Sequence, residues 1–175
     1  MAYSPAPNYP QGLSGMEVPP GYLPIKVAQY CRTCPTTGRR LPNRWSIFIP
    51  TSVDYGVGNH YELAGDPPMN YARSTFNRHN ELYSYERGSL TVGYVSPRMM
   101  PILESYFNAV PTEYLRGQWS SQEWVHEVLQ TIEAMDHMGM QVVDTTFANL
   151  SRQMAFLETA WEAEEAKARK FKLGS

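Results

Sequence analysis

The segment 119–125 has the residue types from which a catalytic helix terminus can be built: Trp-Ser-Ser-Gln-Glu-Trp-Val. Ser120 and Glu123 have the spacing of a capping box, in which each side chain binds the backbone N–H of the other residue. Ser121 then falls on the first helical turn. There the helix dipole lowers the pKa of a thiol, but a serine hydroxyl still needs an adjacent base to react. The segment is therefore explained as a helix start, and it is also the best candidate position for a nucleophile.

Any base for this serine must come from another element of the chain. The chain has four histidines, namely His60, His79, His126 and His137. His60 and Glu62 are two residues apart on an expected strand, so their side chains share one face of a sheet. A histidine on a strand is more often a hydrogen-bonded structural residue than a ligand, and that alternative stays open. No pair of histidines has the spacing of a metal site, so we expect neither a metal nor a cofactor.

The two cysteines, Cys31 and Cys34, form a C-x-x-C pair. A zinc site needs two further ligands at close spacing, and the sequence has no second such pair. A redox pair normally lies at a helix N-terminus after a strand, whereas this one follows a proline-rich stretch. We expect ordinary thiols, with the zinc and redox roles as alternatives.

Composition excludes several classes of protein. The chain of 175 residues carries a net charge of −2, so no basic field attracts nucleic acid or anionic lipid. No apolar run approaches the roughly 18 residues of a membrane helix, and the N-terminus has no signal-peptide pattern. Aromatic residues make up 13%, more than in a disordered chain. These features predict a soluble cytoplasmic protein with neither a nucleic-acid partner nor a membrane span.

Proline usage divides the chain, because eight of the 14 prolines fall in residues 1–42. Proline fixes φ and lacks a donor, so this stretch is predicted to form an extended arm without a helix or a central strand. Its tyrosines, together with Leu23 and Ile25, favour docking of the arm on the remainder of the protein.

The residues that follow the arm are predicted to form strands. Residues 44–49 are rich in β-formers, and turn residues at 54–59 lead to a second strand at 60–64, which gives a hairpin. Two further strands are expected at 82–86 and 89–95.

The second half of the sequence predicts helices at 97–108, from Ser120 to about Gly139, and at 144–171. The last of these has an apolar stripe spaced 3-4-3-4 that packs on the domain or on a partner helix: Phe147, Leu150, Met154, Leu157 and Trp161. The fold class is therefore α+β, with an antiparallel sheet packed against helices. We divide the chain into the proline-rich arm at 1–42, an α+β core domain at 43–140 and a long C-terminal amphipathic helix at 141–173.

Four segments resemble, in order and spacing, a family of small, mostly uncharacterised fungal proteins. They are Arg44-Trp45-Ser46-Ile47-Phe48, His60-Tyr61-Glu62-Leu63-Ala64-Gly65, Val92-Gly93-Tyr94-Val95 and the segment 119–125. Members of the family have His-Trp on the first strand, Val-x-Gly at the end of the second, and Asn-Cys-Gln-x-Trp-Val at the start of the helix. The last motif is similar to the Asn-Cys-Glu-His-Phe-Val of lecithin:retinol acyltransferase-like proteins. The resemblance covers residues 43–140 and implies a permuted papain-like (NlpC/P60-type) fold, in which a strand histidine activates a helix-capping cysteine.

The chain departs from the family pattern at the catalytic positions. Ser121 replaces the cysteine, Ser120 the preceding asparagine and Arg44 the histidine. Arg44 cannot accept a proton at neutral pH, and serine without a base is a poor nucleophile. The resemblance therefore implies that thiol chemistry is lost, unless His60 or Glu62 acts as a new base.

The family fold implies a cleft in which six residues cluster: Arg44, Trp45, His60, Trp119, Ser121 and Trp124. Candidate catalytic residues are Ser121, His60 and Arg44, and candidate ligand-binding residues are Trp45, Glu62, Trp119, Gln122 and Trp124. Aromatic walls and one fixed cation suit an apolar ligand that carries a carbonyl or an acid. We expect a cofactor-independent protein that binds or shapes a small molecule, by cyclisation or isomerisation, in a fungal secondary-metabolite pathway.

Three alternatives remain. The tryptophans can simply belong to the core, with Arg44 as a surface cation at a strand start. The chain can be a non-catalytic interaction protein, a pseudoenzyme whose apolar stripe and aromatic arm hold a protein partner or a second copy. It can also be a hydrolase or acyltransferase that uses Ser121.

Overall fold

The computed structural model describes residues 16–33, 36–51, 57–64, 70–77, 86–111, 120–135, 139–143 and 145–173. The strands in these ranges are β1 (Leu23–Thr33), β2 (Arg40–Pro50), β3 (Val57–Ala64), β4 (Asn70–Asn77), β5 (Glu86–Val95) and β6 (Met140–Val142). The helices are α1 (Met100–Ala109), which a 3-10 turn at Pro97–Met99 precedes, α2 (Ser121–Ala134) and α3 (Phe147–Leu173).

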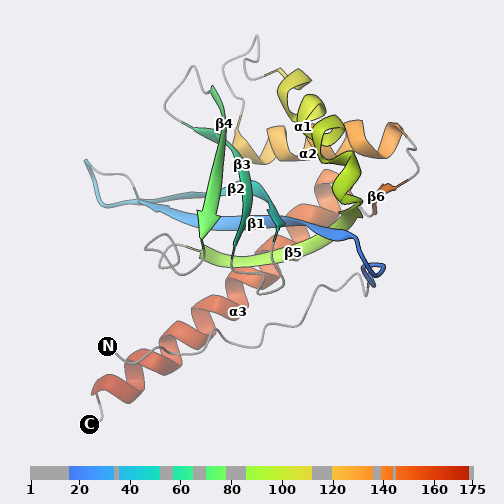
Figure 1. Cartoon of the computed structure of the whole chain (residues 1–175). Helices are drawn as coiled ribbons and strands as arrows, with labels where there is room; N and C mark the ends of the chain where they lie inside the picture. The colour runs from blue at the N-terminus through green and yellow to red at the C-terminus, as the bar shows by residue number, and fades with distance from the viewer. Residues whose placement is uncertain are drawn as a thin grey trace.

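The strands form one antiparallel sheet in the order β4-β3-β2-β1-β5-β6 (Figure 1). The predicted hairpin is confirmed, since β2 pairs with β3 and Ile47 lies opposite Tyr61. The three predicted helices are present with small differences at their ends. The α+β class, with an antiparallel sheet and helices packed against it, is therefore confirmed.

The prediction that residues 1–42 contain no central strand is wrong. β1 lies inside the sheet between β2 and β5. Pro24 is its second residue, at the end of the strand, where a missing N–H disturbs the ladder least. From Ile25 onward β1 alternates, with Ile25 and Val27 buried in the main core. The prediction relied on the number of prolines in the whole stretch, and therefore missed this short segment in which buried apolar residues alternate.

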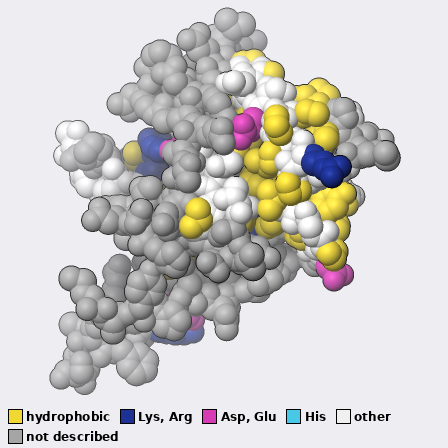
Figure 2. All heavy atoms as spheres, viewed as in Figure 1, with side chains coloured by type: hydrophobic (Ala, Val, Ile, Leu, Met, Phe, Trp, Pro, Cys, Tyr) yellow, Lys and Arg dark blue, Asp and Glu magenta, His cyan; other side chains and the backbone are white. Residues whose placement is uncertain are grey.

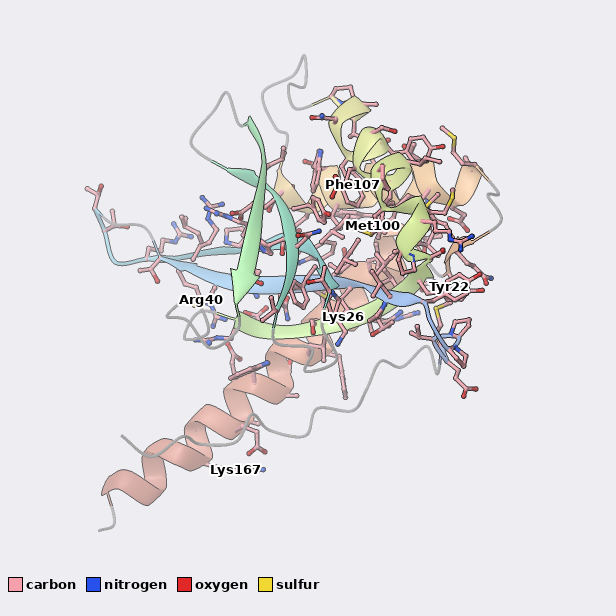
Figure 3. The ribbon with its side chains drawn as sticks, in the orientation of Figure 1. Tyr22, Lys26, Arg40, Met100, Phe107 and Lys167 are labelled. Carbon is pink, nitrogen blue, oxygen red and sulfur yellow. The ribbon has the colours of Figure 1, made fainter. Side chains whose placement is uncertain are left out.

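The helices all cover one face of the sheet, which we call the helix face. Alternate residues of β1, β2 and β5 point toward the helices and form a single hydrophobic cluster with them. The largest fully buried side chains that the helices contribute are Leu103, Phe107, Trp124, Leu129, Leu150 and Met154. Figure 3 shows Phe107 on α1 in the packed layer between α1 and the sheet.

The apolar stripe of α3 packs mainly on the protein's own core. Leu150, Met154 and Leu157 are buried there, whereas Phe147 is 39% exposed. Arg40, at the start of β2, forms ion pairs with Glu158 and Glu162 of α3. Beyond these contacts α3 extends past the sheet (Figures 1 and 3). Because three residues of the stripe are buried in the protein's own core, less of the stripe is available to a partner than the sequence suggested.

Apolar side chains also gather on the surface around α1 (Figure 2). Ile102 on α1 and Met135 at the end of α2 are 40% and 43% exposed. No helix among the described residues is both long and apolar enough to cross a membrane.

Candidate functional site

The eight predicted site residues do not form one group. Successive side chains of a strand point to opposite faces of the sheet, so Arg44 and Trp45 cannot share a side. Trp45, which is 3% exposed, lies in the core cluster on the helix face together with Trp124. Arg44 points to the opposite face, which we call the second face, and its side chain reaches Glu62 there. Trp119 lies outside the described residues.

The start of α2 has the predicted capping box. The Glu123 N–H donates to the Ser120 hydroxyl at 3.3 Å, and the Ser120 N–H donates to the Glu123 carboxylate at 2.7 Å. Two of the orphan donors of the first turn are thereby satisfied. The capping box fixes the point at which α2 begins and therefore the position of Ser121.

Ser121 and Gln122 join this helix end to β2. The backbone N–H of Trp45 donates to Ser121 Oγ at 3.1 Å, and Gln122 Nε2 donates to the carbonyl oxygen of Asn43 at 2.9 Å. Ser121 is buried, and among the described residues neither an imidazole nor a carboxylate bonds its hydroxyl. Within the part of the chain that the structure describes, Ser121 therefore has no base that could activate it.

The second face instead holds a chain of polar contacts that centres on His60. His60 Nε2 lies 2.7 Å from Ser46 Oγ, and His60 Nδ1 lies 3.9 Å from Glu62 Oε1. The other oxygen of Glu62 accepts a hydrogen bond from Arg44 Nη1 at 3.0 Å. We call these three residues, Ser46, His60 and Glu62, the Ser46 array.

Strand register brings the array together. Ala28 of β1 lies opposite Ser46, and Phe48 of β2 lies opposite His60. Both apolar side chains are buried in a small cluster of their own on this face. The ring of Tyr30 meets the ring of His60 edge-on, with centroids 5.5 Å apart. Apolar and aromatic side chains therefore surround the imidazole of His60.

Burial lowers the pKa of His60 below its usual 6.5, because the charged form loses its hydration. The charge of Glu62 acts in the opposite direction and raises this pKa, whereas the charge of Arg44 lowers it. The net shift is downward, so the imidazole is neutral at pH 7. Glu62 faces Nδ1 and favours a proton there, which leaves the Nε2 lone pair to accept the Ser46 hydroxyl.

The exposed fraction of the side chains rises from Ser46 toward the ion pair between Arg44 and Glu62. Ser46 has no exposed surface, and the side chains of His60, Glu62 and Arg44 are 8%, 21% and 33% exposed. Solvent therefore meets the array at Arg44 and Glu62, and any ligand would first contact it there.

The sequence reasoning missed Ser46 and Tyr30. Ser46 lies two residues after Arg44 on the same strand, so the register of the predicted hairpin places it on the face of His60. Tyr30 belongs to the stretch predicted as the arm, and the alternating residues of β1 that include it are the signal that could have placed it on a strand.

The other candidate ligands do not gather. Cys31 lies near the end of β1 as a free, partly exposed thiol, and His126 packs edge-on against Phe147 with centroids 5.5 Å apart. Cys34, His79 and His137 lie outside the described residues. In the part of the chain that the structure describes, no three His, Cys, Asp or Glu side chains could hold a metal ion.

Comparisons of the chain with protein-family models, with curated proteins and with solved structures gave no match.

Proposed function

We propose that this chain is a cofactor-independent small-molecule-binding protein whose ligand contacts the second face at Arg44, Glu62 and His60. The observation that carries the proposal is the buried imidazole, held between a serine hydroxyl and a carboxylate. A titratable group whose pKa is shifted by burial and by specific charge partners is a candidate for a functional site.

The chemistry of this face suits an apolar ligand that carries a carbonyl or a carboxylate. The guanidinium of Arg44 has five N–H donors, of which Nη1 supplies one to Glu62, and its side chain is one-third exposed. Tyr30, which is half-buried and lies opposite Arg44 on the neighbouring strand, supplies aromatic surface next to it. His60, neutral at pH 7, can take and return a proton, which is the step that an isomerisation or a cyclisation of a carbonyl compound requires.

We further propose that the fold is of the permuted papain-like type. The N-terminus of α2 docks against β2 through the Ser121–Trp45 hydrogen bond. This arrangement is compatible with a helix-capping nucleophile that lies beside a strand, as the resemblance implies. In this chain the helix position is a serine that no base among the described residues contacts, and we propose that the site on the second face takes over the chemistry. The resemblance alone supports a place in a fungal biosynthetic pathway.

An NMR titration tests the binding proposal. The imidazole C–H signals of His60 are followed while small aromatic carboxylic acids and ketones are added to the full chain. We expect at least one compound of this class to shift these signals, and Arg44→Gln to weaken its binding by roughly tenfold, the effect of one lost charge-assisted hydrogen bond.

The matched control is Arg40→Gln, since Arg40 also pairs with glutamates but lies at the start of β2 beside α3. This variant should bind as the wild type does. If no compound of the class shifts the His60 signals, or if both arginine variants bind equally weakly, the proposal is wrong.

A further inference from the structure

We propose that the ligand of the second face is a carboxylate rather than a neutral carbonyl compound, and that a proton binds to His60 together with it. The inference rests on the proposed function, because it concerns the same site, and it adds the charge of the ligand and a pH dependence of its binding. The carboxylate contacts Arg44, whose side chain is 33% exposed, so the ligand needs no access to the buried Ser46. Only the proton has to reach the imidazole.

The charges of the site balance before a ligand arrives. Arg44 is a cation, and Glu62, whose Oε2 accepts the 3.0 Å hydrogen bond from Arg44 Nη1, is an anion. His60 is neutral at pH 7, because burial lowers its pKa. A carboxylate that binds to the other N–H donors of Arg44 therefore gives the site an excess of negative charge, unless a proton enters with it.

His60 has the surroundings to hold that proton. Its Nδ1 lies 3.9 Å from Glu62 Oε1, the carboxylate oxygen that is not bonded to Arg44. Its Nε2 lies 2.7 Å from Ser46 Oγ, and a serine hydroxyl can accept a hydrogen bond as well as donate one. When a proton from the solvent bonds to Nε2, the hydroxyl turns to accept it. The protonated ring then has an acceptor at one nitrogen and an anion within ion-pair distance of the other.

The ligand and the proton favour each other because each changes the charge that the other meets. The positive charge of Arg44 lowers the pKa of His60, and a carboxylate bound to Arg44 offsets that effect. Binding therefore raises the pKa of His60, and protonated His60 must strengthen carboxylate binding by the same factor. A neutral ketone brings no charge to the site, so its binding is not coupled to a proton in this way.

The strands packed around His60 add no further charge next to it among the described side chains. Tyr30 of β1 meets the imidazole edge-on, and the uncharged Ser74 of β4 lies opposite His60. Lys26 of β1 stands in the same row across the sheet, but Phe48 lies between Lys26 and His60. The two charges of the ion pair are the ones that act on the imidazole, so a ligand that binds to this pair acts on it as well.

Calorimetric titration of the full chain tests the inference. Benzoate and acetophenone, and the matching naphthalene acid and methyl ketone, are added in HEPES and in Tris. The two buffers release different heats when they lose a proton, so the two binding enthalpies give the number of protons taken up. We expect the acids to bind at least tenfold more tightly than the ketones, with net proton uptake. Their affinity should rise roughly fivefold or more from pH 8 to pH 6, a range in which the acids themselves stay ionised.

Three variants define the expected pattern, and circular dichroism checks that each one folds. His60→Gln should still bind the acids, but without proton uptake and without the rise in affinity at low pH. His126→Gln, the matched histidine variant, should behave as the wild type does. Glu62→Gln leaves the cation of Arg44 unbalanced, so it should bind the acids more tightly and take up fewer protons. A merely unfolded variant could not bind more tightly.

The measurement on the wild-type chain decides the inference even if a variant does not fold. Acids that bind without proton uptake, or ketones that bind as tightly as acids, overturn the inference and leave the binding function standing. Proton uptake that persists in folded His60→Gln also overturns it. If neither acids nor ketones shift the NMR signals of His60, the proposed function fails and the inference fails with it.

Discussion

The two faces of the sheet carry opposite chemistry on the same strands. On the helix face, Ile47 and Val27 lie opposite each other in an apolar core. The next pair, formed by Ala28, which follows Val27, and Ser46, which precedes Ile47, lies on the second face, where the ionisable groups gather. Because side chains alternate along a strand, one side of the sheet can hold the fold together while the other is free for polar groups.

The side-chain amide of Gln29 is fully buried on the helix face, and its hydrogen bonds connect elements of the fold. Its Nε2 donates to the carbonyl oxygens of Arg87 and Met154, each at 2.9 Å. Its Oε1 accepts a bond from Asn43 Nδ2. These bonds join β1 to β2, β5 and α3. The polar groups of the second face include a base, a carboxylate and a hydroxyl, and their interactions depend on pH.

The largest change in the free energy of unfolding is expected from a substitution in the core. Trp124 has no exposed surface and packs near Phe107. Trp124→Ala should lower the free energy of unfolding by roughly 3–5 kcal/mol, because it removes a large buried side chain and leaves a cavity. Urea denaturation measures this change. Phe156→Ala, at a 50% exposed aromatic of α3, is the control and should change it little. Similar losses in both variants would contradict the assignment of the core to the helix face.

A smaller loss of stability is expected from a substitution of the buried Gln29. Gln29→Leu leaves the carbonyl oxygens of Arg87 and Met154 without this donor. We expect the free energy of unfolding to fall by about 2 kcal/mol, since the change removes the three hydrogen bonds that the Gln29 side chain makes with Arg87, Met154 and Asn43. Gln141→Leu, at an exposed position of β6, is the matched control. A neutral result for Gln29→Leu would show that packing alone stabilises the helix face.

The second face should give the protein a pH-dependent stability. The pKa of His60 is lower in the folded state than in the unfolded chain, so the unfolded state binds more protons just below pH 6.5. The free energy of unfolding should therefore fall as the pH drops from about 6.5 through the folded pKa. His60→Gln should reduce this slope, and His126→Gln should not. Equal slopes in the two variants would place the pH dependence elsewhere.

The smallest effects are expected at the ion pair. Arg44→Gln should lower the free energy of unfolding by less than about 1 kcal/mol, because both partners are partly exposed. The same change should raise the pKa of His60, whereas Glu62→Gln should lower it further, because the two charges act in opposite directions. NMR titration of His60 measures both shifts. Shifts of the same sign would show that the two charges do not govern this imidazole.

Features set by neighbours in sequence could be predicted. The capping box of Ser120 and Glu123 uses residues three apart, and the β2–β3 hairpin uses strands that follow each other closely in the sequence, so both follow from local patterns. The central position of β1 could not be predicted in this way, because it depends on pairing with β5, far along the chain. The candidate site was predicted in part. His60 and Glu62 lie together, but the partner of His60 is Ser46, and that contact depends on strand register rather than on a motif.

The central position of β1 has a consequence for how the chain folds as it is synthesised. β1 leaves the ribosome before β2 and can pair with it as soon as β2 has been made, with Tyr30 opposite Arg44. Its other edge pairs Val27 with Leu90 and must wait until β5 has been made. Pairing over such a separation is slow and leaves an unpaired strand edge exposed in the meantime. The nascent chain is therefore most prone to aggregate before β5 emerges.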